Sequence, residues 1–258
     1  MSDFPTGSPA EQDLDAYRRS FGETTRAWAK HTFECTDSGW LAFSGMARPD
    51  YNLALVHGGN AAEQVGQVIE SVSALRKPAL VMLAGAGLSG AQTLADAGWV
   101  SLQAMPFMHR PLGGARPIDG VREITEDDLP ACQEVAALAF GVGPELAAAV
   151  YTAETLHRPD ATAYGLFVDD ALVSCLLSCR AGSTVTGWAL ATHPDHRRAG
   201  YAARLIAGGK NLEVERNGDS RDLCLASPAG VPLYASLDFV TVEYWQVWSR
   251  PRWVLGAS

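Results

Sequence analysis

The chain repeats one order of expected elements, and this repeat restricts its fold more than any other feature of the sequence. In each half a strand runs into a glycine-containing loop and a long helix, followed by a second strand, a short helix and a strand that opens with an aromatic residue. The expected elements are strand 52–56, helix 61–75, strand 79–83, helix 89–97 and strand 99–105 in the first half, and strand 184–192, helix 201–216, strand 222–226, helix 230–237 and strand 239–248 in the second. Gly90 and Gly230 each lie nine residues before the aromatic residue that opens the last strand. This matched spacing predicts two copies of one α/β unit; two unrelated α/β stretches with ordinary loop lengths are the alternative.

A segment rich in proline and glycine, 115–120, separates the two copies. Such a composition is typical of a linker, so we expect two domains, 1–114 and 119–258. The second domain also contains strand-like runs at 163–168 and 171–179, joined by two aspartates, and we expect them to form an antiparallel hairpin. The expected fold class is therefore α/β, with mixed and mostly antiparallel sheets flanked by helices in two tandem domains.

Charge and composition narrow the range of functions. The 258 residues include 29 acidic and 20 basic side chains, and the net charge of -9 disfavours a broad basic surface for nucleic acid or anionic membranes. Five cysteines without a C-x-x-C pair indicate reduced thiols rather than a disulfide framework or a zinc site, and we expect no metal. The N-terminus lacks a basic start followed by an apolar stretch, so we expect a cytoplasmic protein, either a monomer or a homodimer.

A basic motif lies between an expected strand and an expected helix of the second half. Its sequence, Arg197-Arg-Ala-Gly200-Tyr-Ala202, matches R-x-x-G-x-G/A, a pattern that cradles a pyrophosphate. Gly200 lets the backbone approach the phosphates, Ala202 is small enough not to obstruct them, and the N–H groups of the helix N-terminus point at the anion. Arg197 and Arg198 add positive charge. An ordinary solvated helix start with basic residues is the alternative.

A tyrosine on the short helix that follows is the second element of interest. Tyr234 lies five residues before Phe239, the aromatic residue that opens the last strand. A helical tyrosine is more often a core residue whose hydroxyl reaches the surface, so this element alone predicts little.

In this order the two elements resemble the GNAT superfamily of acetyl-CoA-dependent N-acetyltransferases. The resemblance covers roughly residues 121–250, and its most specific stretch is 190–202. It implies a mixed sheet whose fourth strand, here 187–192, splays from the fifth so that the pantetheine of acetyl-CoA inserts between them. Backbone N–H groups of the basic motif would hold the pyrophosphate.

The resemblance also implies a set of cofactor-binding residues. Two positions on the splayed strand would offer main-chain hydrogen bonds to pantetheine, and Ser227 stands where the family often has an asparagine that contacts the cofactor. The implied residues are Leu190, Thr192, Arg197, Arg198, Ala199, Gly200, Tyr201, Ala202, Ala203 and Ser227.

The chemistry of acetyl transfer assigns a role to the tyrosine. A neutral amine attacks the thioester, and the departing thiolate benefits from a proton donor. Tyr234 occupies the family's donor position, and a hydroxyl with a pKa near ~10 is protonated at neutral pH. The base that deprotonates the amine is open, with Glu154, His157 and Glu243 as possibilities that no spacing supports.

The sequence departs from the family pattern at two places. Asp238 replaces the glycine that usually precedes the aromatic of the last strand, and aspartate tolerates left-handed backbone better than most residues. After Trp248 only ten residues remain, too few for the usual final hairpin. We therefore expect a strand from the other half to complete the sheet.

The first half is similar to a degenerate GNAT domain, as in tandem members of the superfamily. Leu94 stands at the tyrosine position, and the loop at 57–60 lacks both the arginine and the full motif spacing. We expect this half to bind no acetyl-CoA and to pack against the catalytic half, where it walls the acceptor site.

A competing motif occurs in the first half. Gly85-Ala-Gly87-Leu-Ser-Gly90 fits G-x-G-x-x-G after an apolar strand, a pattern typical of dinucleotide binding. No acidic residue occurs at 100–118, where the ribose-binding acid belongs, and the motif lies far from the chain start. The context therefore disfavours a dinucleotide site.

Together these features predict an N-acetyltransferase that moves an acetyl group from acetyl-CoA to a primary amine of a small molecule. The alternative is an acyl-CoA-binding regulatory module without turnover. We expect residues around 140–144 and Tyr244 to line the acceptor pocket, but no motif identifies the acceptor.

Overall fold

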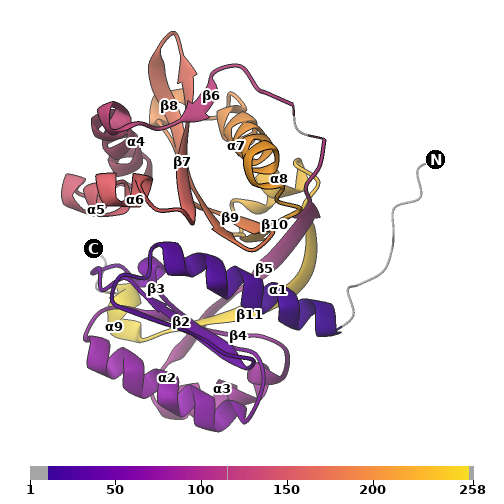
Figure 1. Cartoon of the computed structure of the whole chain (residues 1–258). Coiled ribbons are helices and arrows are strands. Elements are labelled where there is room, and N and C mark those ends of the chain that lie inside the picture. Colours follow the sequence, from indigo (N-terminus) through magenta and orange to yellow (C-terminus); the bar gives the residue numbers. More distant parts are fainter. Residues whose placement is uncertain (1–10, 115, 256–258) are drawn as a thin grey trace.

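A computed structural model describes residues 11–114 and 116–255. Its strands form one eleven-stranded mixed sheet in the order β1-β2-β3-β4-β11-β5-β10-β9-β8-β7-β6 (Figure 1). The strands are β1 Thr32–Cys35, β2 Gly39–Phe43, β3 Asn52–Val56, β4 Leu80–Leu83, β5 Val100–Pro111, β6 Val121–Glu123, β7 Ala161–Val168, β8 Ala171–Ala181, β9 Thr184–Thr192, β10 Arg221–Leu225 and β11 Val240–Ser249. The α-helices are α1 Glu11–Thr24, α2 Ala61–Leu75, α3 Ala91–Asp96, α4 Leu129–Phe140, α5 Pro144–Val150, α6 Ala153–Leu156, α7 Tyr201–Asn217, α8 Val231–Ala235 and α9 Pro251–Leu255. The 3-10 turns are η1 Thr25–Ala27, η2 Pro49–Tyr51, η3 Gly85–Gly90, η4 Glu126–Asp128 and η5 Pro194–His196. Two parts of the predictions lie outside the described residues: the N-terminal stretch, which was examined for a targeting signal, and Ala115, the first residue of the expected linker.

The two halves exchange their last strands. β5, which ends the first half in sequence, pairs antiparallel with β10 of the second half, with His109 opposite Leu223. β11 of the second half lies between β4 and β5, with Val247 opposite Met82. The expectation that a strand from the other half completes the sheet is confirmed. Because the sheet runs through both halves, the limits 1–114 and 119–258 stay a prediction.

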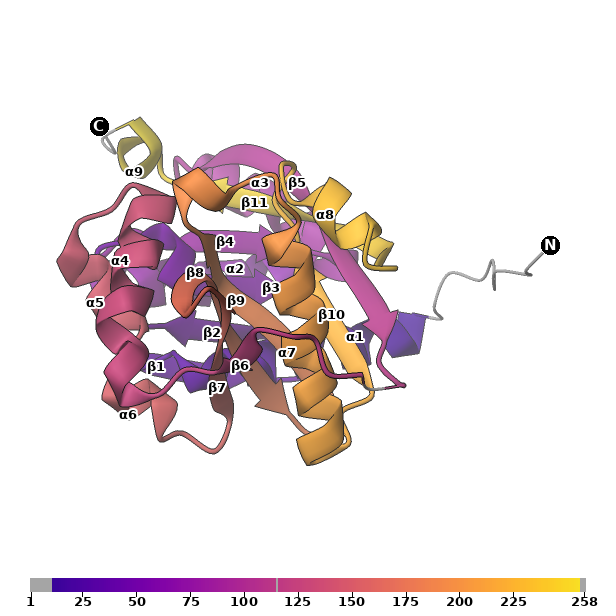
Figure 2. The same ribbon diagram turned by 90° about the horizontal axis from the view of Figure 1, so that it is seen from above.

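The two ends of the sheet face each other across helix α1. Figure 1 shows α1 between the strands of the first half and those of the second, with α2 and α3 outside the first and α7 outside the second. In the view from above, α4, α5 and α6 gather on one side of the molecule (Figure 2). The sheet is thus flanked by helices, as the fold class required.

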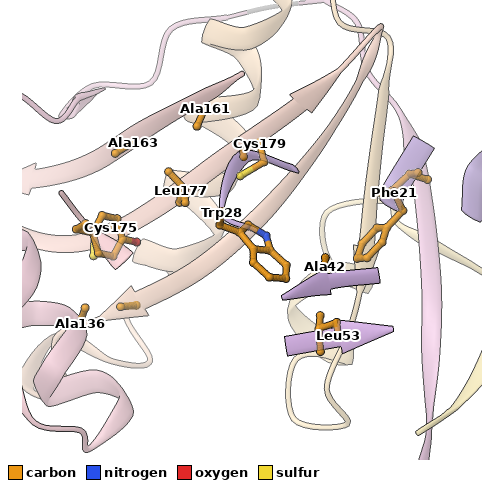
Figure 3. Close-up of a cluster of buried hydrophobic side chains, with 14 of the residues drawn as sticks. Phe21, Trp28, Ala42, Leu53, Ala136, Ala161, Ala163, Cys175, Leu177 and Cys179 are labelled. Atoms are coloured by element: carbon orange, nitrogen blue, oxygen red, sulfur yellow. The ribbon is translucent and has the colours of Figure 1, made fainter. Parts of the chain in front are cut away.

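A shared core joins the halves. Figure 3 shows Trp28 of the first half beside Leu177 and Cys179 on β8, and these residues belong to one buried cluster with Phe21. The ring centroid of Phe21 lies 5.5 Å from that of Trp188. Buried aromatic pairs at this separation stabilise a fold beyond the area that they bury, so the halves pack as one unit.

Three elements have the expected bounds. Strands 52–56 and 184–192 and helix 61–75 are observed at those residues. Asp169 and Asp170 have φ of 49° and 63°, the left-handed pair that a two-residue hairpin turn requires, so the expected hairpin of β7 and β8 is confirmed.

Two expected elements of the first half have different bounds. The strand expected at 99–105 extends to Pro111, because β10 supplies hydrogen-bond partners for its second part. The helix expected at 89–97 begins as the 3-10 turn η3 and continues as the shorter α3. The first difference results from pairing between the halves, which the local pattern does not contain.

Asp238 adopts the backbone conformation that its position requires. Its φ is 63°, so the turn between α8 and β11 survives the replacement of the usual glycine. The backbone N–H of the following Phe239 donates to the carbonyl of Tyr234 at 3.2 Å. This bond fixes the short helix against the start of the last strand.

The cysteines form no disulfide, and four of the five are buried. All five cysteines are free, and burial raises the pKa of the Cys224 thiol to about 12, so this thiol stays protonated and unreactive.

Within residues 11–114 and 116–255, no single helix has the length and apolarity to cross a membrane; a pair bent by 119°, 126–140 with 144–156, meets that test by length and composition only.

Asp219 makes stability depend on pH. Its side chain is buried, and burial together with Glu213 raises its pKa to about 6. An unfolded aspartate titrates near ~3.9, so the folded protein binds the proton more tightly and loses stability as pH rises from about 4 through about 6. We expect Asp219→Asn to raise the free energy of unfolding at pH 7.5 by on the order of 2 kcal/mol and to change it little at pH 4.

Urea unfolding at the two pH values measures this difference. Asp13→Asn, which removes an exposed carboxylate from α1, is the matched control and should leave stability unchanged at both. Equal stability of wild type and Asp219→Asn at pH 7.5 would contradict the assignment.

Candidate functional site

A gap opens between β9 and β10 in the second half. The two strands pair in parallel only from Thr184 opposite Arg221 to Thr186 opposite Leu223. Beyond that point no strand of the described chain pairs with residues 187–192 on the β10 side. The splay that the family resemblance implied is thus present.

A bulge in β9 lies at the mouth of this gap. The register with β8 shifts between Cys175 and Leu177, and Ala189 has a φ of 51°. The hydroxyl of the buried Tyr151 donates to the carbonyl oxygen of Ala189 at 2.7 Å and holds the bulge in place. Bulges re-aim the strand and end its pairing, which accounts for the local loss of contact with β10. Tyr151 has no motif around it and was not predicted from the sequence.

The basic loop, residues 197–203, joins β9 to α7 at one end of the gap. Gly200 precedes the helix with a φ of 78°, and nothing lies within 4 Å of the position that a Cβ would take there. A cavity of about 580 Å³, the loop cavity, lies against this segment. The implied cofactor residues that line it are Leu190, Thr192, Arg197, Arg198, Gly200, Tyr201, Ala202 and Ala203. The N-terminus of the long helix α7 therefore faces an open, concave site of the kind that binds anions.

The two arginines of the basic loop differ in what they contact. The guanidinium of Arg197 donates to the carbonyl of Ala139 at 2.8 Å and to that of Thr192 at 3.4 Å, which ties the end of α4 to the loop. Arg198 is exposed, has a φ of 65°, and has no side-chain partner among the described residues. Arg198 is therefore the arginine free to meet an anion, and Arg197 shapes the loop. Ala199 is exposed and does not line the loop cavity.

Tyr234 lines a second cavity, which continues from the gap. This gap cavity has a volume of about 560 Å³ and is also lined by Leu190, Cys224 and Ser227. Burial and the neighbouring Cys224 thiol raise the pKa of Tyr234 well above its ordinary value, so its hydroxyl keeps its proton at neutral pH. The ring packs edge-on against Phe239, with centroids 5.3 Å apart.

Ser227 has a structural role besides its place in the gap cavity. Its Oγ accepts a hydrogen bond from the backbone N–H of Gly230 at 3.2 Å, at the start of α8. A hydroxyl retains a donor and a second lone pair after accepting one bond, so contact with a ligand stays open to it.

A third cavity, of about 260 Å³, lies between the halves, and we call it the apolar cavity. It is lined by Met46, Arg48, Asp50 and Tyr51 of the first half and by Ala136, Phe140, Val142, Leu146, Ala147, Val150, Tyr151, Trp188, Ala189 and Leu190 of the second. Leu190 lines all three cavities, which therefore meet at the bulge of β9. The first half thus contributes one wall of this cavity, with residues that were not predicted from the sequence.

Some of the residues expected around the acceptor pocket line one of these cavities, and Tyr244 does not. Phe140 and Val142 line the apolar cavity. Tyr244 is 61% exposed on β11, opposite Pro106, and lines none of the three cavities. The exchange of strands places its side chain outside these three cavities, and its role at the acceptor pocket stays a prediction.

The three possible bases are engaged elsewhere. Glu243 accepts a hydrogen bond of 2.8 Å from the buried Arg18. Glu154 pairs with Lys30 at 2.7 Å and His157 with Glu126 at 3.3 Å, both on the surface. None of the three lines a cavity of the site.

Within the described residues no group of three or more His, Cys, Asp or Glu side chains could hold a metal ion.

The matching strands of the first half do not splay. β3 and β4 pair in parallel from Leu53 opposite Leu80 to Val56 opposite Leu83, and the N–H of Ala84 extends the ladder to the carbonyl of Val56 at 3.1 Å. This continuous pairing leaves no equivalent opening for pantetheine between the two strands.

The glycines of the competing motif serve this close packing. A Cβ on Gly87 would lie 2.0 Å from the carbonyl oxygen of Val56, and one on Gly90 would lie 2.7 Å from the side chain of Val65. Gly85 has a φ of 48° and lies against the guanidinium of Arg18. Backbone geometry therefore explains all three glycines without a dinucleotide.

Known proteins match this chain through structure alone. No family model and no curated protein matches it. A GCN5-related N-acetyltransferase from Kribbella flavida has 15% identity and a TM-score of 0.66, with 90% of this chain and 94% of that chain covered. An acetyltransferase from the GNAT family of Colwellia psychrerythraea has 12% identity and a TM-score of 0.56, with 93% and 94% covered. A tandem GNAT protein from the clavulanic acid biosynthesis pathway has 13% identity and a TM-score of 0.51, with 82% and 78% covered.

These similarities define the fold. Each extends over both halves of the chain, and at such identities the likeness concerns architecture rather than substrate. The chain has a GNAT-like fold, as the family resemblance implied.

Proposed function

We propose that the second half of the chain transfers an acetyl group from acetyl-CoA to a primary amine of a small molecule. The observation that carries this proposal is the gap between β9 and β10, which runs from the basic loop to Tyr234. The loop cavity and the gap cavity share Leu190, so one extended ligand can occupy both. The GNAT fold supports acetyl transfer as the general activity.

The basic loop would hold the pyrophosphate of the cosubstrate. Free N–H groups at the start of α7 and the guanidinium of Arg198 offer donors and positive charge to it. The backbone of 187–192, which lacks a strand partner on one side, would bind pantetheine, with Leu190 and Thr192 as the donors and acceptors. The first half, whose strands stay paired, takes no acetyl-CoA in this proposal.

Tyr234 would supply the proton that the leaving group needs. When bound, acetyl-CoA presents a thioester whose carbonyl carbon the amine nitrogen attacks. The C–N bond forms, the C–S bond breaks, and the sulfur takes the hydroxyl proton of Tyr234. The proton lost by the amine passes to solvent, from which the tyrosine is reprotonated.

Release of free CoA tests this proposal against a regulatory module that only binds the cosubstrate. The full-length protein is mixed with acetyl-CoA and a panel of primary amines, and both free thiol and acetylated product are quantified. We expect one product molecule for each thiol released with at least one amine. Binding of acetyl-CoA without thiol release on any amine of the panel would favour the regulatory module.

A further inference from the structure

An ion pair from the first half lies on the wall of the apolar cavity. Arg48 and Asp50 flank Pro49 at the turn η2, and a guanidinium nitrogen of Arg48 lies 2.6 Å from Oδ2 of Asp50. The side chains are 37% and 52% exposed, so both reach solvent-accessible space. Oδ1 of Asp50 has no hydrogen-bond partner among the described residues, and the same holds for the other guanidinium nitrogens of Arg48.

The buried side-chain amide of Asn52 holds the backbone around this pair. Asn52 is fully buried, and its side chain donates to the carbonyls of Met46 at 2.8 Å and Arg48 at 3.0 Å. It also donates to the carbonyl of Pro78 and accepts from the N–H of Gly45. Three of these contacts, to Gly45, Met46 and Arg48, fix segment 45–50 to one buried side chain, so a rigid element presents the pair.

The rest of the cavity wall is apolar. The side chains beside the pair are aliphatic or aromatic, apart from the hydroxyls of Tyr51 and Tyr151, and that of Tyr151 already binds the carbonyl of Ala189. A dry cavity of ~150 Å³ holds a benzene ring, so about 260 Å³ accommodates one ring or a branched alkyl group with a short stem. A long polyamine or a polar sugar has no matching polar wall here.

Asp50 lies where the two reactants must meet. It lines the apolar cavity and also the gap cavity, and it shares this position with Trp188, Ala189 and Leu190 of the β9 bulge. Tyr234 lies in the same gap cavity. A nitrogen bound to Asp50 would therefore enter the space that the thioester is proposed to occupy.

We propose that the acetyl acceptor is a free α-amino acid with an apolar side chain, an inference that rests on the proposed function. Its ammonium would bind the free carboxylate oxygen of Asp50, its carboxylate would bind the open N–H groups of Arg48, and its side chain would fill the apolar cavity. The two charged groups of an amino acid are attached to one carbon atom, and they match a protein ion pair whose atoms lie 2.6 Å apart. This arrangement gives the first half a specificity role without a cofactor.

The arrangement also provides the missing acceptor for the amine proton. The ammonium passes one proton to Oδ1 of Asp50, and the neutral nitrogen forms the C–N bond as the C–S bond breaks. A second proton leaves the nitrogen for solvent, and the thiolate is protonated by Tyr234. Asp50 then returns its proton to solvent and Tyr234 takes one from solvent, so each turnover releases one proton.

Two pairs of acceptors separate the contributions of the two charges. L-leucine is compared with isopentylamine, and L-phenylalanine with phenethylamine; each amine keeps the apolar group and lacks the carboxylate. We expect kcat/KM for each amino acid to exceed that of its amine at least 10-fold. In Arg48→Gln the KM of the amino acid should rise at least 10-fold and that of the amine should stay within 2-fold.

Asp50→Asn should lower kcat/KM at least 10-fold for amino acids and amines alike, because both present their nitrogen to this residue. Lys77→Gln and Glu70→Gln remove exposed charges after and within the C-terminal part of α2 and are the matched controls, which should behave as wild type. Circular dichroism and the affinity for CoA are measured for every variant.

The outcomes separate this inference from the function on which it rests. If CoA binds and amines are acetylated as well as or better than amino acids, the inference is overturned and the acetyltransferase assignment holds. If CoA binds and no apolar amino acid is acetylated, the inference is overturned as well. If CoA does not bind at all, the proposed function itself fails.

Discussion

Replacing Gly200 by Asp is expected to weaken the binding of CoA about 100-fold and to lower the unfolding temperature only by the backbone strain that a side chain meets at a positive φ. Gly200 has a φ of 78°, a conformation that aspartate adopts more readily than most residues, and no atom lies within 4 Å of the new Cβ. The new carboxylate would lie beside the pyrophosphate. Two unit charges ~4 Å apart repel by about 4 kcal/mol near a protein surface, of which a 100-fold loss requires about 2.8 kcal/mol. Calorimetric titration measures the affinity.

The chain offers a matched control for this variant. Gly182 lies in the turn between β8 and β9, with a φ of 56° and nothing within 4 Å of its Cβ position. Gly182→Asp introduces the same charge and the same backbone strain on the surface away from the gap. We expect its affinity for CoA to equal that of wild type. Equal affinity of Gly200→Asp and wild type would exclude the basic loop as the pyrophosphate site.

Replacing Tyr234 by Phe is expected to lower kcat about 100-fold and to change the affinity for CoA by less than 2-fold. The variant loses only the hydroxyl, and its ring can keep the edge-on contact with Phe239. General acid catalysis typically contributes ~100-fold or more, and the departing thiolate would otherwise leave without a proton. Steady-state kinetics with saturating acetyl-CoA measure this effect.

Tyr244→Phe is the control for that variant. Tyr244 is an exposed tyrosine of β11 outside the three cavities, so its hydroxyl should be dispensable. A Tyr234→Phe variant with the kcat of wild type would show that another group, or solvent, protonates the thiolate.

Local pattern was sufficient for most elements of this fold. Strand β9 was predicted at its observed bounds because a mostly apolar and β-branched run ends at a sharp change to charged and turn-forming residues. The left-handed conformation of Asp238 was expected from the family resemblance, which implies a glycine there, and from the tolerance of aspartate for this backbone. Such features depend on the residues themselves and on near neighbours, which a single sequence displays.

The exchange of strands depends on interactions that the local pattern does not encode. β11 has an alternating pattern that fits several partners, and its pairing with both β4 and β5 is set by the packing of one half against the other. The short C-terminus indicated that a strand was missing without saying how the two halves would share their strands. The length of β5 and the exposed position of Tyr244 both follow from this exchange.

The sequence predicted one part of the candidate site, the basic loop, and did not predict the part that the first half supplies. The basic loop carries a motif of contiguous residues, and its cavity includes eight of the ten implied cofactor residues. Arg48 and Asp50 were missed because they reach the cavity only through contact between the halves. Arg48-Pro-Asp50 does place two opposite charges beside a rigid residue, and this signal is visible in the sequence.

The titration of acetyl-CoA into the full-length protein tests the central claim most directly. The open strands of the second half and the paired strands of the first predict one binding site per chain, lost in Gly200→Asp and retained in Gly182→Asp. Two sites per chain would contradict the assignment of the first half. The absence of any binding would contradict the account of the second.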